Sequence, residues 1–271
     1  MKNQVKTFRL FVRPDERSLQ IANRIRELNQ KSSKPLVETE TADLVIAIGG
    51  DGTFIDAVAS TNFSKDIIYT GIHTGTLGFL QDLCENDIFS LIQYINFEQE
   101  LKTRKLHIAS IEVTLKDDST VHFFALNDIL VAGNIFSTIR FEEYINDKFL
   151  QNITGSGIII ATSTGDTAHS ANADGAIDLS NNCQLVCTPI HPIRSGAYER
   201  FIPNSIICSK INMLFHPTNI MDIIVDGKKK DIDSHSIKKV EVSASDSIFI
   251  NKLDLMNYSK VRVIREKILG Y

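Results

Sequence analysis

The sequence predicts an α/β N-terminal domain with a parallel sheet, followed by a β-rich C-terminal domain. In the first hundred residues, short apolar runs alternate with stretches whose apolar residues recur at helical spacing. Strands that alternate with helices in this way form a parallel sheet covered on both faces. Beyond residue 100 the helical spacing almost disappears, and short strand-like runs follow one another. This pattern favours antiparallel strands.

The periodicity of the apolar residues defines the elements of the N-terminal half. The sequence Arg-Pro-Asp at residues 13–15 interrupts the first apolar run, and a helical pattern begins after it. We expect strands over residues 8–12, 44–48 and 67–72, and helices over 19–28, from Thr53 onward and over 88–95.

In the C-terminal half, runs rich in β-branched and aromatic residues predict strands. These lie at residues 107–115, 121–126, 137–145, 148–153, 157–161, 205–216, 221–225, 238–243 and 246–250. The helical signal there is confined mainly to residues 165–176, and a late apolar run at 261–264 predicts one more strand. The basic run at 228–230 lies between Asp226 and Asp231 and is expected to form a solvated turn.

The composition excludes several classes of protein. The chain has 271 residues, a net charge of −4 and a pI near 6.0, which does not favour a nucleic-acid-binding protein. No apolar run approaches the roughly 20 residues that a membrane-spanning helix needs. The N-terminus lacks the apolar core of a signal peptide. We therefore expect a cytoplasmic protein with neither membrane nor nucleic-acid partners.

The cysteines are expected to be buried thiols rather than disulfides or zinc ligands, because no Cys-x-x-Cys pair is present. They are Cys84, Cys183, Cys187 and Cys208. Cys183 and Cys187 lie four residues apart, but the nearby His191 is not enough to indicate a zinc site. The sequence therefore predicts no metal site built from protein side chains.

The most informative stretch is Gly-Gly-Asp-Gly-Thr at residues 49–53, directly after the strand at 44–48. Glycines allow the backbone to approach a ligand closely, and free N–H groups at a helix start attract phosphate. A carboxylate at such a site, here Asp51, can accept a proton or work with a metal in phosphoryl transfer. The alternative is a strand-to-helix turn without a ligand. The position at a strand's carboxyl end, where open α/β sheets bind ligands, favours the phosphate site.

Four blocks resemble those of the NAD kinase family. The first block is residues 49–53, and the second is Gly-Ile-His-Thr-Gly-Thr-Leu-Gly-Phe at 71–79. The third is Ala-Leu-Asn-Asp at 125–128, and the fourth is Ala-Thr-Ser-Thr-Gly-Asp-Thr-Ala-His-Ser at 161–170. The resemblance covers roughly residues 40–250 in the family's order. Diacylglycerol, sphingosine and phosphofructokinases share only the first block.

The resemblance implies transfer of a phosphate from ATP, or polyphosphate, to the 2′-hydroxyl of the NAD adenosine ribose, giving NADP. A divalent cation such as Mg²⁺ would accompany the ATP. The family also suggests a homodimer or homotetramer and an active site in the cleft between the domains. It implies a nucleotide-binding domain over residues 1–100, to which 252–271 return, and an NAD-binding domain over 101–251.

The resemblance also assigns roles to individual residues. Asp51 would take or orient the proton of the hydroxyl, and the backbone at Gly50 and Gly52 would approach the phosphates. Asn127 and Asp128 would hold the ribose and the nicotinamide side of NAD. The remaining nucleotide-binding candidates are Thr53, Phe79, Thr164, Thr167, Ala168 and Ser170, with His73, Asp166 and His169 as further candidates. Thr164 and Ala168 would line the adenine pocket.

The fourth block departs from the family's pattern. Ser163 replaces the usual Pro, Asp166 a Ser, His169 a Tyr, and Asp174 the first Gly of a Gly-Gly pair. The Asp166 carboxylate is favourable at a helix start but would repel a nearby pyrophosphate. A paralogue that binds NAD or NADP with weak or no turnover therefore stays an alternative. A diacylglycerol-type lipid kinase is a second one, disfavoured by the second, third and fourth blocks.

Several of these residues also have purely structural explanations. The Asn-Asp pair at 127–128 can be a turn or cap pair, and His73 can be a turn histidine. Thr164 or Ser163 can serve as a helix N-cap. The Asp-Gly pair at 226–227 resembles a turn of the family, but a hairpin glycine needs no function. The segment at 188–193 resembles a family stretch, after which Arg194 or Arg200 would face a phosphate or lie on the surface.

Overall fold

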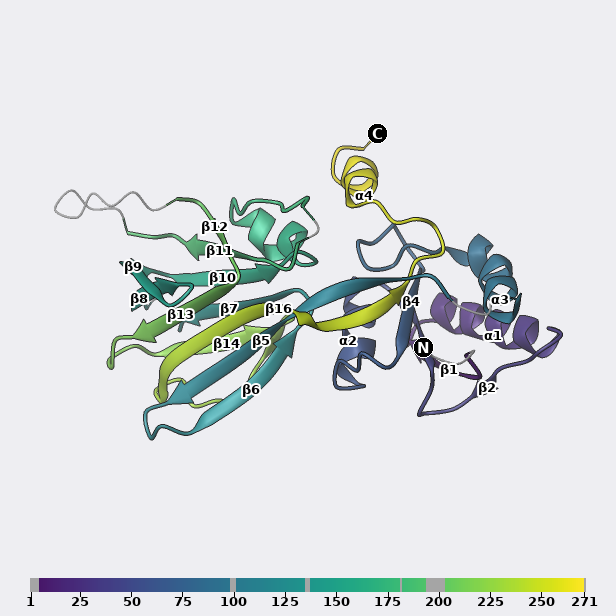
Figure 1. Cartoon of the computed structure of the whole chain (residues 1–271), viewed down its shortest axis with the longest axis horizontal. Helices are drawn as coiled ribbons and strands as arrows, with labels where there is room; N and C mark the ends of the chain where they lie inside the picture. The colour runs from purple at the N-terminus through teal and green to yellow at the C-terminus, as the bar shows by residue number, and fades with distance from the viewer. Residues whose placement is uncertain (1–4, 98–100, 135–136, 181, 194–202, 271) are drawn as a thin grey trace. The chain divides into compact units, whose positions relative to one another are not determined.

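The computed structural model describes the whole chain except residues 1–4, 98–100, 135–136, 181, 194–202 and 271 (Figure 1). The chain forms two compact units. The first unit contains Met1–Leu106 together with Phe249–Tyr271, and the second unit contains His107–Ile248. The fold class predicted from the sequence, an α/β part followed by a β-rich part, is confirmed.

A parallel sheet forms the centre of the first unit. Its strands lie in the order β2 (Val37–Glu38), β1 (Thr7–Val12), β3 (Leu44–Gly49) and β4 (Ile68–His73). The last residues of β16 (Ile237–Leu253) add a further parallel pairing, in which Asn251 lies opposite Ile68. The three strands expected at 8–12, 44–48 and 67–72 are all present.

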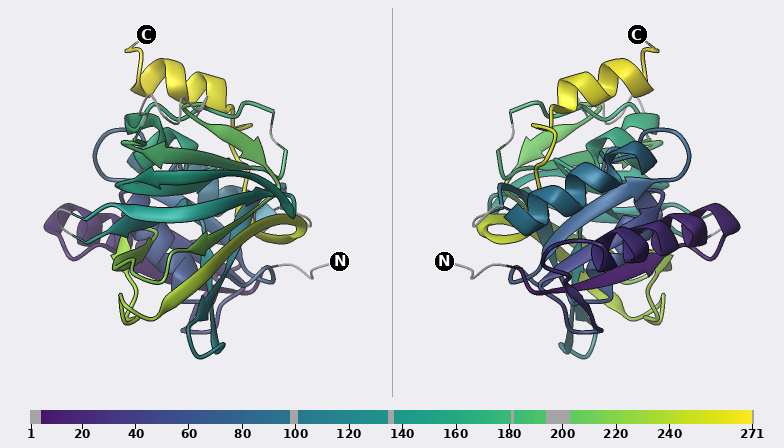
Figure 2. Two further views of the ribbon diagram at one scale, coloured as in Figure 1. Left: turned by 90° about the vertical axis from the view of Figure 1, so that its left-hand side faces the viewer. Right: turned by 90° about the vertical axis from the view of Figure 1, so that its right-hand side faces the viewer.

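Helices cover both faces of this sheet. They are α1 (Glu16–Gln30), α2 (Asp51–Ala59) and α3 (Ile88–Phe97), which is preceded by the 3₁₀ turn η1 (Glu85–Asp87). Alternate residues of β3, including Ile46, pack with α1 and α3, which lie side by side (Figures 1 and 2). On the α2 side, Phe54 packs edge-to-face against Tyr69 of β4. β3 is therefore buried on both faces, as its unbroken apolar run predicts.

The strand expected at 261–264 is wrong, because this segment forms the helix α4 (Lys260–Lys267). The run of Val and Ile residues suggested a strand, but Ser259 caps a helix start by accepting a hydrogen bond from the Arg262 N–H at 3.3 Å. Val263 is the one buried residue of α4. A cap and a single buried position thus override the β-propensity of the segment.

The second unit contains two antiparallel layers. In one, the order is β12 (Ile206–Cys208), β11 (Leu185–Ile190), β10 (Gly157–Thr162), β7 (Asp128–Gly133), β14 (Met221–Val225) and β15 (Lys228–Lys229). In the other layer, the order is β9 (Lys148–Gly155), β8 (Ile139–Ile145), β13 (Lys210–Phe215) and β16. β16 also pairs with β5 (Thr103–Leu115), which in turn pairs with β6 (Thr120–Ala125). Val131 and Ile160 of the first layer share one core with Phe141, Met213 and Val242 of the second.

β7 and β11 are absent from the strands that the sequence predicts. β7 begins only three residues after β6 ends, so the two strands looked like one run ending in a polar turn. The expected helix over 165–176 is also mostly wrong. A short π-helical segment, η2 (Asp166–Ser170), has a kink at Ala168, and the helical residues end at 172. The left-handed backbone of Asp174, with φ of 61°, turns the chain away from the helix.

Two expected strands merge into β16, and the expected strand over 205–216 is divided into β12 and β13. In the basic run at 228–230, Lys228 and Lys229 are exposed to solvent but form the short strand β15 rather than a turn, and Lys229 pairs with Asp222 of β14 at 2.9 Å. Among the described helices, none combines the length and the hydropathy that a membrane crossing requires.

Candidate active site

The first block forms the turn between β3 and α2. β3 ends at Gly49, and Gly50 is the N-cap residue of α2. The Gly50 N–H donates to Thr53 Oγ1 at 3.3 Å, and a Cβ at Gly49 would lie only 2.4 Å from this oxygen. A Cβ at Gly50 or Gly52 would instead meet no atom of the described part of the chain within 4 Å. The chain's own packing therefore explains Gly49 but leaves the backbone of Gly50 and Gly52 open to a ligand.

Both oxygens of the Asp51 carboxylate accept hydrogen bonds from the end of the second block. The Phe79 N–H donates to Oδ2 and the Leu80 N–H donates to Oδ1, each at 3.0 Å. A Cβ at Gly78 would lie 2.1 Å from Asp51 Oδ1, so this close approach requires glycine. The Asp51 side chain is still 26% exposed. It therefore joins the two blocks while remaining accessible to a ligand.

Two cationic side chains lie near this turn. Lys267 of α4 places its Nζ 3.5 Å from Asp51 Oδ2 and 4.6 Å from the centre of the Phe79 ring. Arg13 directly follows β1, and its Nη2 donates to Thr74 Oγ1 at 3.0 Å. Each already has a carboxylate partner, since Lys267 pairs with Asp51 and Arg13 Nε lies 2.6 Å from Asp15 Oδ2. The two side chains therefore place cationic donor groups at the turn without giving it a net positive charge.

The second block is held against the first by a buried amide. The Gln81 side chain is fully buried, and its Nε2 donates to the Gly50 carbonyl oxygen at 2.6 Å. A Cβ at Gly71 would lie 2.7 Å from Gln81 Cγ. His73, at the end of β4, lies opposite Gly49, and its Nδ1 is 2.8 Å from the Gly75 carbonyl oxygen. The ring of His73 thus stabilises its own loop.

A single carboxylate in the second unit holds the third block. Asp226 accepts hydrogen bonds from the N–H groups of Leu126, Asn127 and Asp128, at 2.9, 2.7 and 3.2 Å. Burial raises the pKa of Asp226, and these three hydrogen bonds oppose that shift. The Asn127 Oδ1 atom is buried and has no hydrogen-bond partner among the residues that the structure describes. An unpaired buried oxygen is costly, so this atom is a candidate acceptor for a ligand donor.

Asp128 is buried and pairs with an exposed histidine. Its Oδ2 lies 3.3 Å from Nδ1 of His169, whose side chain is 64% exposed. Burial raises the pKa of the Asp128 carboxyl, and the histidine opposes the shift. His169 stands where the resemblance would place Tyr, so the substitution exchanges a phenol for a cation-forming partner of Asp128.

The fourth block is joined to the third through a threonine hydroxyl. Thr162 Oγ1 donates to the Leu126 carbonyl oxygen at 2.6 Å and accepts from the N–H groups of Thr164 and Gly165, at 3.1 and 3.3 Å. A Cβ at Gly165 would lie 2.2 Å from the Asn127 carbonyl oxygen. Gly165 itself is the N-cap residue of η2, without a side-chain cap. Neither Ser163 nor Thr164 therefore caps this helix.

Asp166 and Ser170 are turned into the second unit. The Asp166 side chain is fully buried, and its Oδ2 accepts a hydrogen bond from the Asp178 N–H at 2.7 Å. Ser170 is also buried, with its Oγ 3.0 Å from Thr188 Oγ1. The Asp166 carboxylate thus anchors the segment that follows the fourth block.

The comparisons with known proteins agree with these blocks. Residues 9–100 match the ATP-NAD kinase N-terminal domain, and residues 126–251 match the ATP-NAD kinase C-terminal domain. The chain is 30% identical over 262 residues to an NAD kinase of Finegoldia magna, which covers 93% of this chain and 94% of the relative. The chain belongs to the NAD kinase family. Its members are phosphotransferases that use a nucleotide phosphate.

Other members of the NAD kinase family align over nearly the whole chain. NAD kinase 2 of Bacillus licheniformis is 29% identical over 265 residues, covering 93% of this chain and 95% of the relative. Yeast NADH kinase complexed with NADH superimposes with a TM-score of 0.81 at 21% identity, covering 100% and 89% of the two chains. An NAD kinase from Archaeoglobus fulgidus in complex with ATP gives 0.68 at 18% identity, covering 93% and 94%. These structures share the fold.

The predicted site residues of this NAD kinase family member form two groups, one in each unit. Around the start of α2 lie Gly50, Asp51, Gly52, Thr53, His73 and Phe79. Around the third and fourth blocks lie Asn127, Asp128, Thr164, Asp166, Thr167, Ala168, His169 and Ser170. Arg194 and Arg200 are outside the described residues.

The residues that hold the blocks in place are not among those that the sequence predicts for the site. Gln81 lies two residues after the second block, so its position near the motif is an available signal. From the sequence, Asp226 is expected only as part of a turn, and Arg13 only as part of a strand break. Nothing in the sequence indicated Lys267, because the wrong strand at 261–264 hid the helix that carries it. Thr162 was quoted within the fourth block but given no role.

Proposed function

We propose that this chain phosphorylates the 2′-hydroxyl of the NAD adenosine ribose with ATP, producing NADP. The observation that carries the proposal is the glycine turn with Asp51 at its centre. The carboxylate is oriented by two backbone N–H groups, while Gly50 and Gly52 leave open space beside it. An oriented carboxylate beside a phosphate-binding turn is what transfer to an alcohol requires.

The reaction needs alignment and charge neutralisation more than covalent chemistry. A ribose hydroxyl is a weak acid, so Asp51 would orient it and accept its proton as the transition state develops. Lys267 and Arg13 would donate hydrogen bonds to the phosphates at the turn. In the second unit, Asn127 and Asp128 would bind the ribose and nicotinamide side, and the unpaired Oδ1 of Asn127 supports this role.

The residues at the turn fit a magnesium ion that arrives with ATP. Magnesium is commonly held by one or two carboxylates together with substrate phosphates, and Asp51 is an accessible carboxylate of this kind. When bound, the ion would neutralise negative charge on the phosphates. Holding the Asp51 side chain in one orientation is then the task of Phe79 and Leu80.

A direct assay tests the proposal. Purified full-length chain is incubated with NAD, ATP and Mg²⁺, and NADP is measured with an NADP-specific dehydrogenase. Parallel reactions replace ATP with polyphosphate and NAD with NADH, which identifies the donor and the acceptor. The proposal is supported if the unmodified chain forms NADP and the Asp51→Asn variant does not. Asp66→Asn is the matched control, because Asp66 is an exposed aspartate of the same unit outside the four blocks.

Two results would contradict the proposal. Tight binding of NAD or NADP without turnover would indicate a sensor, a reading that the altered fourth block keeps open. Phosphorylation of diacylglycerol in place of NAD would indicate a lipid kinase.

We further propose, on the family resemblance alone, a cytoplasmic homodimer or homotetramer. Light scattering coupled to size-exclusion chromatography measures the mass, and a monomer at micromolar concentration would contradict the assembly.

A further inference from the structure

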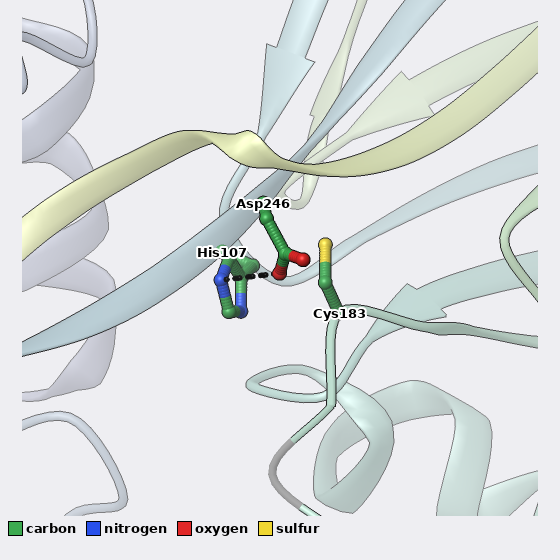
Figure 3. A group of neighbouring side chains, drawn as sticks. All are labelled: His107, Cys183 and Asp246. Carbon is green, nitrogen blue, oxygen red and sulfur yellow. Dashed lines mark ion pairs between the residues drawn. The ribbon is translucent and has the colours of Figure 1, made fainter.

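Three side chains with metal-binding atoms meet in the second unit, away from the four blocks in sequence (Figure 3). They are His107 of β5, Cys183 in the segment before β11, and Asp246 of β16. Their candidate ligand atoms all lie within 4.8 Å of one another, and His107 Nε2 is 3.4 Å from Asp246 Oδ1. Within the part of the chain that the structure describes, this is the one such group of three.

We propose that His107, Cys183 and Asp246 bind a divalent transition-metal ion of the zinc type. Thiolate sulfur, imidazole nitrogen and carboxylate oxygen are the donors that zinc uses, whereas magnesium and calcium prefer oxygen ligands alone. Three protein ligands leave one tetrahedral position for water or another ligand. The ligands of this site therefore differ in chemistry from the oxygen ligands that would hold a magnesium ion accompanying ATP.

The exposure of the three residues suits the entry of a metal ion. The His107 side chain is 16% exposed and Cys183 is half-buried, whereas the Asp246 side chain is 88% exposed. The carboxylate can therefore adjust its position around an ion with little disturbance, and the other two ligands come from more ordered surroundings. Separations of up to 4.8 Å between donor atoms need only small side-chain rotations to reach zinc coordination distances.

An activated cysteine nucleophile is the competing explanation, and the surroundings of Cys183 oppose it. Burial and the Asp246 charge raise the pKa of this thiol to about 11. A nucleophilic cysteine needs the opposite shift, usually from an adjacent cation. The dashed line in Figure 3 marks the ion pair of the His107 imidazole with the Asp246 carboxylate, so the imidazole is paired with the carboxylate rather than with the thiol. A cation bound between the two groups would offset the negative charge of the Asp246 carboxylate and so stabilise the Cys183 thiolate.

The metal would connect three separate parts of the second unit. β5 and β16 provide two ligands, and the segment between the fourth block and β11 provides the third. That segment also includes Asp178, whose N–H donates to the buried Asp166. Metal binding should therefore order the segment that supports the fourth block and stabilise the folded second unit.

Cobalt substitution tests the site without using enzymatic activity. The full chain is treated with a chelator and titrated with Co²⁺ and then Zn²⁺, without nucleotide or Mg²⁺. We expect one ion per chain, the visible bands of tetrahedral Co²⁺, and a sulfur-to-cobalt charge-transfer band. Cys183→Ser should remove the charge-transfer band and weaken Zn²⁺ binding by about tenfold or more, since even supporting residues cost about 10–100-fold.

Matched variants separate this site from nonspecific binding. Cys84→Ser removes a half-buried thiol of the first unit, and His122→Ala removes an exposed histidine 3.8 Å from Glu112. Both should bind Co²⁺ as the unmodified chain does. Asp246→Asn should weaken Co²⁺ binding while keeping the charge-transfer band. Because the Asp246 side chain is exposed, this substitution should leave the fold intact. Absence of the band in the unmodified chain, or its persistence in Cys183→Ser, would overturn the proposal.

Discussion

Replacing Asp51 with Asn should impair both catalysis and the loop that the carboxylate holds. In the folded chain, each carboxylate oxygen accepts one backbone N–H, from Phe79 and from Leu80, at 3.0 Å. An Asn side chain has one oxygen acceptor and one NH₂ donor. Whichever way the amide is turned, its NH₂ group faces one of the two N–H donors. The substitution therefore leaves one backbone N–H without an acceptor.

The structure limits the size of each effect. An unsatisfied N–H group costs about 1–3 kcal/mol. Because the Asp51 side chain is 26% exposed, water can replace part of the lost bond, and we expect the lower half of that range in unfolding free energy. Loss of a general base typically lowers turnover by about 10²–10⁴-fold. The variant should thus remain folded while NADP formation nearly disappears.

Urea denaturation and NADP formation, measured on the same preparation, check both parts. Gly78→Ala provides a comparison, because its Cβ would lie 2.1 Å from Asp51 Oδ1 and displace the loop while the carboxylate stays. NADP formation by folded Asp51→Asn within tenfold of the unmodified rate would refute the catalytic role. An unfolding free energy of Asp51→Asn equal to that of the unmodified chain would show that the two hydrogen bonds to Asp51 do not stabilise the loop at Phe79 and Leu80.

Three further predictions follow from other buried groups. Asn127→Ala should weaken NAD binding, by about 0.5–1.5 kcal/mol for one hydrogen bond, while leaving ATP binding unchanged in calorimetric titrations; equal weakening of both would indicate a structural role only. Because Asp166 accepts from the Asp178 N–H inside the unit, Asp166→Ser should lower the melting temperature and leave the ratio of NADP to NAD affinity unchanged at low salt; a selective gain in NADP affinity would contradict this. Burial lowers the pKa of Lys252 from 10.5 to about 8 in the folded chain. Between these pH values the unfolded chain binds more protons than the folded chain, so the unfolding free energy should rise as the pH increases from about 8 to about 10.5. That rise should be absent from denaturation curves of the Lys252→Met, Asp82→Leu double variant, which replaces the whole buried ion pair.

The elements of the first unit could be predicted because their apolar patterns are local. The run at 44–48 is apolar at every position, and β3 is buried on both faces. The helix over 19–28 was recognised by its spacing, and Asp15 caps it by accepting from the Ser18 N–H at 3.1 Å. Both signals lie within a few residues of the element that they define.

The errors lie where tertiary contacts override local preference. α4 was taken for a strand because its Val and Ile residues favour β structure, whereas the Ser259 cap and the burial of Val263 decide for a helix. β7 was missed because the polar pair at 127–128 resembled a turn. In the fold Asp128 starts the strand directly after Asn127, and Asp226 from a distant hairpin accepts hydrogen bonds from the N–H groups of both.

By itself, the sequence determined the main strands and helices of the first hundred residues, the fold class, and the four blocks that identify the family. Those features depend on residues that are close together along the chain, where spacing and residue type carry the information. Only the tertiary structure showed that Asp51 is held by the second block and Asn127 by Asp226, and that His107, Cys183 and Asp246 meet. The ligands of the proposed metal site are 76 and 63 positions apart (107 to 183 and 183 to 246). Sequence spacing cannot reveal such a group, because it is the pairing of strands and the packing of loops that bring distant residues together.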